Sequence, residues 1–393
     1  MYHQQTIAVV TTHPIQYYAP IFQLLTSKGV KVKVFYTWGE SVLKEKFDPG
    51  FGKVVSWDIP LLNGYDYTFV ENVSTKPGSS HFNGINNPSL IKQLKEFGPD
   101  LILVIGWNFK SHLQVIRYFK GKVPVVFRGD STLINQKPGG IKTIIRKLFL
   151  TWVYRHIDYA LYVGTENKKY YQFAGLKDKQ LVFAPHAIEN SRFTELGADA
   201  IASVETLKKQ LDIENGTTVF LYAGKFEPVK NLVFLVTTFK QLAIPNACLL
   251  LVGNGPLEKE LKEISNNCTY IKFLDFQNQS TMPLIYTMAD VFVLPSISET
   301  WGLAINEAMA CSKPILASNK VGCAVDLVKD GMNGYVFDAG SQTDLSNKIS
   351  LLNTNKKQLQ QMGAASLSMI SKWNFDAIAD AIIGILQKTK EAH

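Results

Sequence analysis

Two glutamates in one short segment, Glu299 and Glu307, are the residues of this 393-residue sequence whose spacing most clearly suggests chemistry. Seven residues separate them, inside the run Ser298–Ala310. The apolar run Val291–Pro295 before them predicts a buried parallel strand that ends at its proline. The Ala- and Met-rich run that starts at about Leu303 predicts a helix. The segment is therefore expected to form a strand, a turn and the start of a helix.

This arrangement puts Glu299 in the turn at the carboxyl end of the strand and Glu307 about two helical turns further along. The amides of Trp301, Gly302 and Leu303 would be free donors at the helix start. Open α/β sheets bind ligands at this edge, and helix N-termini favour anions. A carboxylate beside such amides can accept hydroxyl hydrogen bonds from a sugar while the amides face phosphate oxygens. The alternative is that Glu299 only caps the helix and Glu307 is a solvated helix residue.

The complete run resembles the E-x7-E signature of the retaining nucleotide-sugar glycosyltransferases of family 4, which have the two-domain GT-B fold. The Trp-Gly-Leu that follows Glu299 and the Glu-Ala-Met-Ala that begins at Glu307 both match it. The resemblance is continuous across residues 218–340 and patchy across residues 1–195. It implies that Glu299 contacts the donor sugar and that Glu307 contacts the ribose hydroxyls.

Two lysines, Lys225 and Lys230, lie in a turn between the apolar run Thr218–Ala223 and the apolar run Leu232–Leu242. Both could point at a pyrophosphate and stabilise the charge that builds on a departing nucleoside diphosphate. The alternative is that they are ordinary exposed lysines. The segment resembles the family's G-R-x-x-x-x-K-G loop, with two departures: Lys225 stands for arginine and Asn231 for glycine. Lysine keeps the charge but loses bidentate geometry, so we expect phosphate binding to be retained.

Two further segments resemble parts of the family's donor site. Gly253–Pro256 resembles its G-x-G-P loop, where glycine lets backbone approach a ligand closely, although a plain turn has the same composition. Phe273–Phe276 occupies the place where relatives contact the base through backbone atoms, and Asp275 replaces the usual glycine there. The candidate donor-binding residues are Lys225, Lys230, Gly253, Glu299, Trp301, Gly302, Leu303 and Glu307.

The expected acceptor side follows two strands of the first half. His13 and Gln16 lie in the loop after Thr6–Val10, where they could hold a sugar or phosphate, or be structural. Arg128 and Asp130 follow the strand at Val123–Phe127. Asp130 could accept the acceptor's proton or orient its hydroxyl, and the alternative is an ion pair with Arg128. His112 and His186 are weaker candidates.

The resemblance also implies the type of reaction. The family's retaining chemistry is described as front-face substitution, in which the leaving phosphate helps to deprotonate the acceptor, so no dedicated strong base is needed. No Asp-x-Asp motif occurs, which suits a metal-independent enzyme without a cofactor. We take four residues as candidate catalytic groups, namely Glu299, Lys230, Asp130 and His13.

Length and pattern predict two domains. A chain of 393 residues exceeds what one core usually holds. Apolar runs alternate with helical stretches, which predicts two α/β Rossmann-like domains facing across a cleft, the GT-B arrangement. We expect an N-terminal domain at residues 1–200 and a C-terminal, nucleotide-sugar-binding domain at residues 216–370, joined through the polar region around residues 195–215. The final helix, at about residues 373–393, is expected to cross back to the first domain.

The charge distribution and the cysteines indicate which classes of partner the protein could bind and where it is found. Residues 1–195 carry 24 Lys and Arg against 14 Asp and Glu, a charge of +10, whereas residues 196–393 carry 17 against 19. This asymmetry indicates an anionic partner for the first half, but no nucleic-acid-binding pattern is present. The four cysteines are widely spaced and lack metal-ligand spacing, which is typical of reduced thiols in a cytoplasmic protein. We see no secretory signal and no apolar run long enough to cross a bilayer.

One predicted helix has a pattern that is typical of binding to a membrane surface. Residues Ile141–Trp152 have apolar side chains at helical spacing with cations between them, which reads as a basic amphipathic helix suited to anionic lipid. The alternative is a helix packed on its sheet with a solvated basic face. Contact with the inner face of the cell membrane would suit a lipid-linked acceptor.

The sequence therefore predicts a retaining glycosyltransferase that moves a sugar from a UDP- or GDP-sugar to a saccharide or lipid-linked acceptor, in surface polysaccharide or lipopolysaccharide synthesis. Two alternatives stay open at this point. One is a nucleotide-sugar epimerase, which can share the GT-B architecture, and the other is a non-catalytic nucleotide-sugar-binding subunit. The Glu-Ala-Met-Ala context and the two loop lysines, Lys225 and Lys230, argue against an epimerase.

Overall fold

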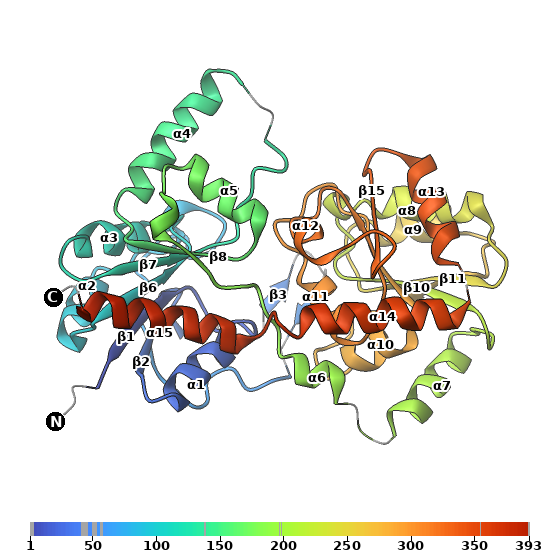
Figure 1. The fold of residues 1–393 in the computed structure, drawn as a ribbon, viewed down its shortest axis with the longest axis horizontal. Coiled ribbons are helices and arrows are strands. Elements are labelled where there is room, and N and C mark those ends of the chain that lie inside the picture. The colour runs from blue at the N-terminus through green and yellow to red at the C-terminus, as the bar shows by residue number, and fades with distance from the viewer. Residues whose placement is uncertain are drawn as a thin grey trace. The chain divides into compact units, whose positions relative to one another are not determined.

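The computed structural model describes residues 4–40, 46–48, 53–55, 58–136, 139–195, 197, 199–353 and 355–391. The chain divides into two compact units. Unit 1 comprises Met1–Glu45, Pro60–His186 and Phe375–His393, and unit 2 comprises Lys46–Ile59 and Ala187–Asn374. Each contains a parallel sheet with helices on both faces (Figure 1), so the expected pair of Rossmann-like domains is confirmed.

The sheet of unit 1 has the strand order β5-β2-β1-β6-β7-β8-β9 among the described residues, and its paired strands run parallel. Strand β1 (Thr6–Thr11) is buried at every position because helices cover both faces of the sheet, which explains its apolar run from Ile7 to Val10. Its strands are β1 (Thr6–Thr11), β2 (Lys31–Tyr36), β5 (Asp66–Phe69), β6 (Leu101–Ile105), β7 (Val125–Arg128), β8 (Tyr159–Tyr162) and β9 (Leu181–Phe183). Its helices are α1 (Ala19–Ser27), η2 (Phe82–Gly84), α2 (Leu90–Phe97), α3 (Lys110–Phe119), α4 (Ile141–Tyr154), α5 (Thr165–Phe173), η3 (Asp178–Gln180) and α15 (Phe375–Glu391).

The sheet of unit 2 has the order β12-β11-β10-β13-β14-β15, again parallel. Its strands are β10 (Thr218–Ala223), β11 (Ala247–Val252), β12 (Ile271–Leu274), β13 (Val291–Leu294), β14 (Ile315–Ser318) and β15 (Gly334–Phe337). Its helices are α6 (Asn190–Thr194), α7 (Ala200–Gln210), η4 (Pro228–Lys230), α8 (Leu232–Leu242), α9 (Glu258–Ile264), α10 (Met282–Met288), α11 (Leu303–Ala310), α12 (Ala324–Leu327), α13 (Gln342–Leu352) and α14 (Lys356–Ile370). A short antiparallel hairpin, β3 (Lys46–Asp48) and β4 (Lys53–Val55), is also assigned to this unit.

Both sheets reverse their strand order at one place. In unit 2 the chain builds outward from β10 through β11 to β12, and then returns with β13 on the other side of β10. In unit 1 the corresponding reversal lies between β1 and β6. Crevices form outside the carboxyl ends of the strands at such reversals. The loops that follow these strands are therefore where a ligand site is expected.

The boundary between the units differs from the one predicted. Unit 1 ends at His186 and not near residue 200, and residues 195–215 are not merely a connection, because they include α7 of unit 2. Ala200 and Val204 on α7 are buried, and α7 packs against α10. The polar surface of α7 concealed these two core contacts. The end of the chain agrees with the prediction more closely, since α15 packs on α1 and β9 of unit 1.

Candidate functional site

Glu299 lies in the turn between β13 and α11, where the sequence places it. Backbone bonds fasten this turn to the loop after β14: the Glu299 amide donates to the Lys320 carbonyl (3.1 Å), and the Gly322 amide donates to the Glu299 carbonyl (3.0 Å). A Cβ atom at Gly322 would lie 1.9 Å from the Thr300 carbonyl oxygen. Glycine is therefore required at residue 322, a role that the sequence analysis missed because this loop does not follow the family's pattern closely.

The structure brings Glu299 together with Lys230. Lys230 Nζ forms a hydrogen-bonded ion pair with Glu299 Oε2. Lys230 ends η4, in the loop after β10, while Glu299 follows β13, and these strands are neighbours at the reversal of the strand order. Both side chains keep about a fifth of their surface exposed, so the pair is screened from solvent but still accessible. A carboxylate and an ammonium group thus meet at the edge where an α/β sheet binds its ligand.

Glu307 is almost completely buried on α11, so it is not the solvated helix residue of the alternative interpretation. The Tyr286 hydroxyl, on α10, donates to Glu307 Oε2 at 2.8 Å. A buried carboxylate needs hydrogen-bond donors, because it has lost those that water provides. Tyr286 therefore holds this carboxylate in a defined position, and no pattern in the sequence indicates this role.

The helix start between the two glutamates depends on backbone geometry. Gly302 has φ 100°, a conformation that favours glycine, and no side chain among the described residues caps α11, which begins at Leu303. The first amides of a helix have no intrahelical acceptor and carry the positive end of its dipole. The Trp301 side chain is buried, with its indole N–H donating to Asn306 Oδ1 (3.0 Å) and its ring 5.3 Å from that of Trp373. Trp301 therefore supplies packing, and only its backbone lies at the turn.

The Lys225 loop and the Gly253 loop pack on each other backbone to backbone. A Cβ at Gly253 would lie 2.0 Å from the Gly224 carbonyl oxygen, and one at Gly255 would lie 2.7 Å from the Phe226 nitrogen. The close approach that Gly253 permits is thus to the chain itself. Lys225 is half-buried in this loop, and the Tyr222 hydroxyl donates to its carbonyl oxygen at 2.8 Å.

The backbone conformation explains why Asn231 can replace the glycine of the family's loop. Asn231 has φ 58° and ψ 35°, the left-handed conformation. Asparagine is one of the few residues other than glycine that adopts it routinely. The replacement of the family's glycine therefore preserves the shape of the loop that carries Lys230.

In unit 1, His13 and Gln16 follow β1 as predicted. His13 Nδ1 lies 2.8 Å from Thr12 Oγ1, and its ring makes an edge-on contact with Trp38, with centroids 5.4 Å apart. Gln16 Oε1 is buried and accepts no hydrogen bond within the described residues. Both side chains lie at the carboxyl edge of this sheet, beside the reversal of its strand order.

Arg128 has a structural role, because its side chain bonds to the backbone of a neighbouring segment. It is buried, and its guanidinium donates to the carbonyl oxygens of Ala184 and Pro185, each at 2.8 Å. These carbonyls precede His186, the last residue before the chain enters unit 2. A side chain committed to two backbone carbonyls is poorly placed to hold an acceptor, so the expected acceptor-binding role of Arg128 gives way to a supporting one.

Asp130 is the half-exposed group of this cluster. Its Oδ2 lies 4.0 Å from Nε2 of the buried His186. Burial, together with the charge of Arg128, lowers the pKa of His186 to about 3, so this imidazole is neutral at pH 7. Asp130 therefore faces a neutral ring here, and it remains accessible to a ligand.

His112 lies on α3, and its side chain is fully buried. Its Nδ1 donates to the Gly106 carbonyl (2.8 Å), and its Nε2 lies 2.8 Å from Thr37 Oγ1. Gly106 follows β6 and Thr37 follows β2, so the imidazole ties together loops at the carboxyl edge of the sheet. Burial lowers its pKa to about 4. His112 is thus a neutral structural group.

Comparisons with known proteins agree with this arrangement. Residues 203–369 match the family model described as glycosyl transferases group 1. An uncharacterized glycosyltransferase of Methanocaldococcus jannaschii is 25% identical over 320 residues, which cover 73% of this chain and 89% of that protein. The lipopolysaccharide 1,2-N-acetylglucosaminetransferase of Salmonella typhimurium is 30% identical over 192 residues, 44% of this chain and 49% of that one. Among solved structures, Anabaena HepE in complex with UDP and glucose matches with a TM-score of 0.71 and 17% identity, over 98% of this chain and all of that one.

The chain therefore has the GT-B fold and is similar to the family 4 glycosyltransferases. Its matched region contains Lys225, Lys230, Glu299 and Glu307, so the candidate donor residues lie inside the part of the chain that the family model covers. The candidate acceptor residues lie outside that part.

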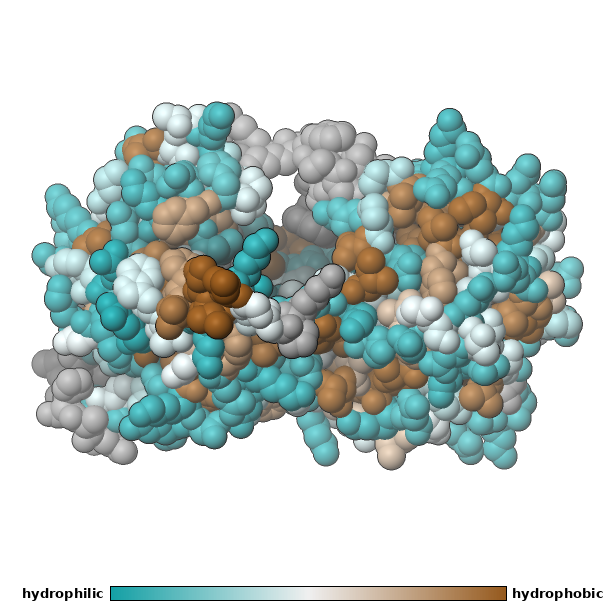
Figure 2. Space-filling view, turned by 90° about the horizontal axis from the view of Figure 1, so that it is seen from above, coloured by the Kyte–Doolittle hydropathy of each residue, from teal (hydrophilic) through white to brown (hydrophobic). Residues whose placement is uncertain are grey.

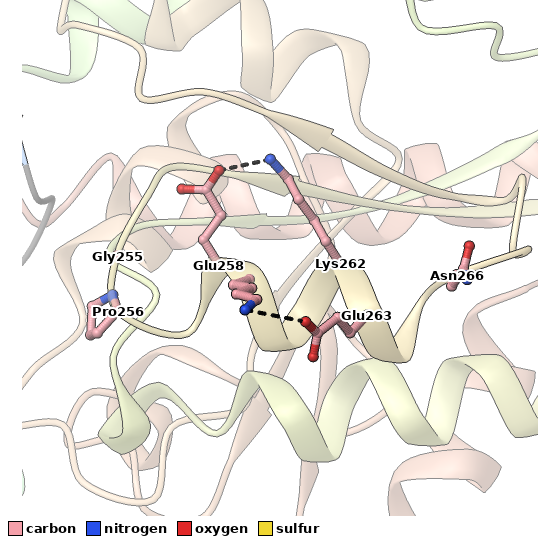
Figure 3. A pocket seen from close by; sticks show the side chains of 7 residues that line it. Gly255, Pro256, Glu258, Lys262, Glu263 and Asn266 are labelled. Atoms are coloured by element: carbon pink, nitrogen blue, oxygen red, sulfur yellow. Dashed lines mark hydrogen bonds and ion pairs between the residues drawn. The ribbon is translucent and has the colours of Figure 1, made fainter.

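A groove of about 610 Å³ lies on unit 2, at the end of β11 and along α9 (Figure 3). Its charged side chains pair with each other one helical turn apart, Lys262 with Glu258 and Lys259 with Glu263. Such pairs are typical of a solvated helix face. The groove contains neither of the loop lysines nor the two glutamates of the α11 segment.

The described residues also lack two features. No group of three or more His, Cys, Asp or Glu side chains is arranged there to hold a metal ion. None of the helices in this part of the chain is long and apolar enough to cross a membrane.

Proposed function

We propose that the protein is a retaining, metal-independent glycosyltransferase that uses a UDP- or GDP-sugar as donor and a saccharide or lipid-linked molecule as acceptor. The observation that carries this proposal is the ion pair of Lys230 and Glu299 at the strand reversal of unit 2. A sugar hydroxyl and a pyrophosphate are the groups that such a carboxylate and ammonium would bind. The binding of UDP by HepE and the lipopolysaccharide substrate of the Salmonella enzyme support the substrate classes.

Each donor residue has a role that fits its position. Glu299 accepts hydrogen bonds from donor-sugar hydroxyls, and when donor binds, Lys230 shares its charge between Glu299 and the pyrophosphate. Lys225, on the neighbouring loop, adds a second positive charge, and the amides at the start of α11 add a fixed dipole. Glu307, held by Tyr286, binds the ribose hydroxyls.

The reaction itself needs few protein groups. The bond between the anomeric carbon and the diphosphate oxygen breaks, and the acceptor oxygen bonds to the same face of that carbon. The departing phosphate oxygen receives the acceptor's proton. In unit 1, Asp130 and His13 orient the acceptor hydroxyl, Gln16 supports it, and Arg128 holds the backbone near them. We place the reaction in surface polysaccharide or lipopolysaccharide synthesis at the inner face of the cell membrane.

The test is nucleoside diphosphate release from a panel of UDP-, GDP- and ADP-sugars, in the presence of a chelator, with and without a saccharide acceptor. Wild type should release diphosphate from one donor, and Glu299→Ala should reduce kcat/KM by about 100-fold or more because a charged contact to the transition state is lost. The control variant is Glu263→Ala, which removes an exposed glutamate on α9 and should behave as wild type. The anomeric configuration of the product, read by NMR, tests retention.

Other outcomes contradict parts of the proposal. Loss of turnover on chelation would exclude metal independence, and an inverted product would exclude retention. An epimerised sugar without transfer would establish the epimerase alternative. A donor that raises the melting temperature but is never turned over, with any acceptor, would establish the non-catalytic alternative.

A further inference from the structure

The first turns of α4 carry large apolar side chains that unit 1 leaves largely exposed, although the Phe149 ring contacts that of Trp107. Ile141, Ile144, Ile145, Leu148 and Phe149, here called the α4 patch, are between 46% and 76% exposed. The helix is attached to the core only further along, through its buried residues Leu150, Val153 and Tyr154. In Figure 1 the helix extends beyond the sheet, and Figure 2, viewed from the side to which α4 points, shows a hydrophobic cluster on this part of unit 1. The simple alternative of a helix packed along its sheet is therefore wrong for residues 141–148.

The spacing of the α4 patch forms a continuous stripe. Residues 141, 144, 145 and 148 lie at i, i+3, i+4 and i+7, which is one face of a helix. In a globular domain such a stripe normally packs against the core. Clustered apolar side chains in contact with water instead mark a surface that binds a partner.

Cations are the other feature of this segment. Lys142, Arg146 and Lys147 alternate with the apolar residues, and α4 contains no Asp or Glu. All three are exposed, and residues 1–195 have a net charge of +10. The partner must therefore offer both an apolar phase and negative charge.

We propose that the α4 patch inserts into the interface of an anionic lipid bilayer, with Lys142, Arg146 and Lys147 at the level of the headgroups. An interfacial helix buries its apolar side by about 5–10 Å and keeps its cations beside anionic lipid. The stripe spans only about two turns, roughly 10 Å, which is small for a stable protein interface of about 800 Å² per partner. A bilayer requires no matching shape, so a short exposed segment is sufficient.

This inference deepens the proposed function, because it rests on a lipid-linked acceptor for its purpose, but the binding itself requires no catalytic step. The test is flotation of the full chain with vesicles that contain 30% phosphatidylglycerol in phosphatidylcholine, compared with phosphatidylcholine alone. Wild type should float with the anionic vesicles, and raised salt should weaken the association.

Two sets of variants separate the contribution of the apolar side chains to vesicle binding from that of the cations. Ile144→Ser with Leu148→Ser should weaken partitioning at least about tenfold, because two exposed apolar chains no longer enter the lipid. Lys142→Gln, Arg146→Gln and Lys147→Gln together should weaken it on the order of 100-fold, at about one kcal/mol per charge. The matched controls lie in unit 2. Ile201→Ser with Leu351→Ser removes two apolar residues that are also more than half exposed. Lys209→Gln, Lys259→Gln and Lys357→Gln together remove three exposed lysines.

Three results would overturn the inference. One is equal binding to neutral and anionic vesicles, and another is binding unaffected by the α4 substitutions. The third is self-association of wild type in sedimentation that Ile144→Ser with Leu148→Ser abolishes, which would make the patch an interface between copies of the chain. Failure of flotation while donor turnover persists would refute only this inference, whereas flotation without turnover would refute only the proposed function.

Discussion

Lys230 and Glu299 form an ion pair that joins two loops from neighbouring strands, although 69 positions separate them in the chain. One follows β10 and the other β13, and the reversal of strand order places the ends of these strands side by side. The pair is pre-organised, because the Glu299 turn is itself bonded to the loop after β14. A donor that binds here meets charges already in place.

Lys230→Gln tests this relationship directly. The change removes the ammonium and should lower kcat/KM by about 100-fold, since a pre-organised charge that stabilises the leaving diphosphate is worth about 2.7–4 kcal/mol. Lys259→Gln, at an exposed lysine on α9, should have no effect. Steady-state kinetics with the donor identified above measures both. Combining Lys230→Gln with Glu299→Gln should cost less than the sum of the two, and strict additivity would mean that the residues act independently.

Gly253→Ala should destabilise unit 2. Its Cβ would lie 2.0 Å from the Gly224 carbonyl oxygen, and φ at this residue is 136°. Strain and displacement of this kind cost about 1–3 kcal/mol. Gly340→Ala is the control, because a Cβ there meets nothing within 4 Å. Urea unfolding followed by circular dichroism gives both values, and an unchanged midpoint for Gly253→Ala would refute the backbone packing described here.

Tyr286→Phe should reveal how firmly Glu307 is held. The substitution deletes the hydroxyl that donates to the Glu307 carboxylate and leaves the ring in place. A hydrogen bond to a charged group contributes about 1.5–3 kcal/mol, so the free energy of unfolding should fall by that order. The donor KM should rise if Glu307 binds ribose. Tyr335→Phe, on β15, is a matched change that should alter neither quantity by much.

Stability should depend on the protonation of His112. Burial holds its pKa at about 4 in the folded protein, below the value of about 6.5 in an unfolded chain. The unfolded state therefore binds the proton more readily, and stability that is present above pH 6.5 is lost as the pH falls toward 4. The full loss from this group is about 3 kcal/mol. His186, whose pKa is also lowered by burial, acts in the same direction.

The measurement is the free energy of urea unfolding at several values between pH 7.5 and pH 5. His112→Gln should have a smaller pH dependence than wild type, although it is less stable at pH 7.5 because a buried hydrogen-bonded group has changed. The double variant with His186→Gln should be flatter still. A wild-type slope retained in His112→Gln would show that this imidazole is not responsible.

The donor segment was predictable because its information is local. A strand, a glycine turn and a helix start follow one another in the run around Glu299, and each is encoded by residue types within it. Asn231 illustrates how local chemistry survives substitution, since its left-handed backbone explains why it can stand for glycine. Most strands of both sheets were likewise readable, because buried parallel strands are continuous apolar runs. The edge strands β5 and β15 are only partly buried, and the sequence analysis did not predict them.

Other features depended on contacts between distant residues. Arg128 follows a strand and resembles an acceptor-side ligand in sequence, but it is committed to carbonyls 56 and 57 positions away. Gly253 resembles a ligand-facing glycine, whereas its missing side chain makes room for the Gly224 carbonyl. The α4 stripe has the same spacing whether it faces a core or water, and only the packing of unit 1 shows that it faces water. Local sequence determines the backbone path and the available charges, but burial and pairing are properties of the whole packed chain, because they depend on what the other segments bring to the same place.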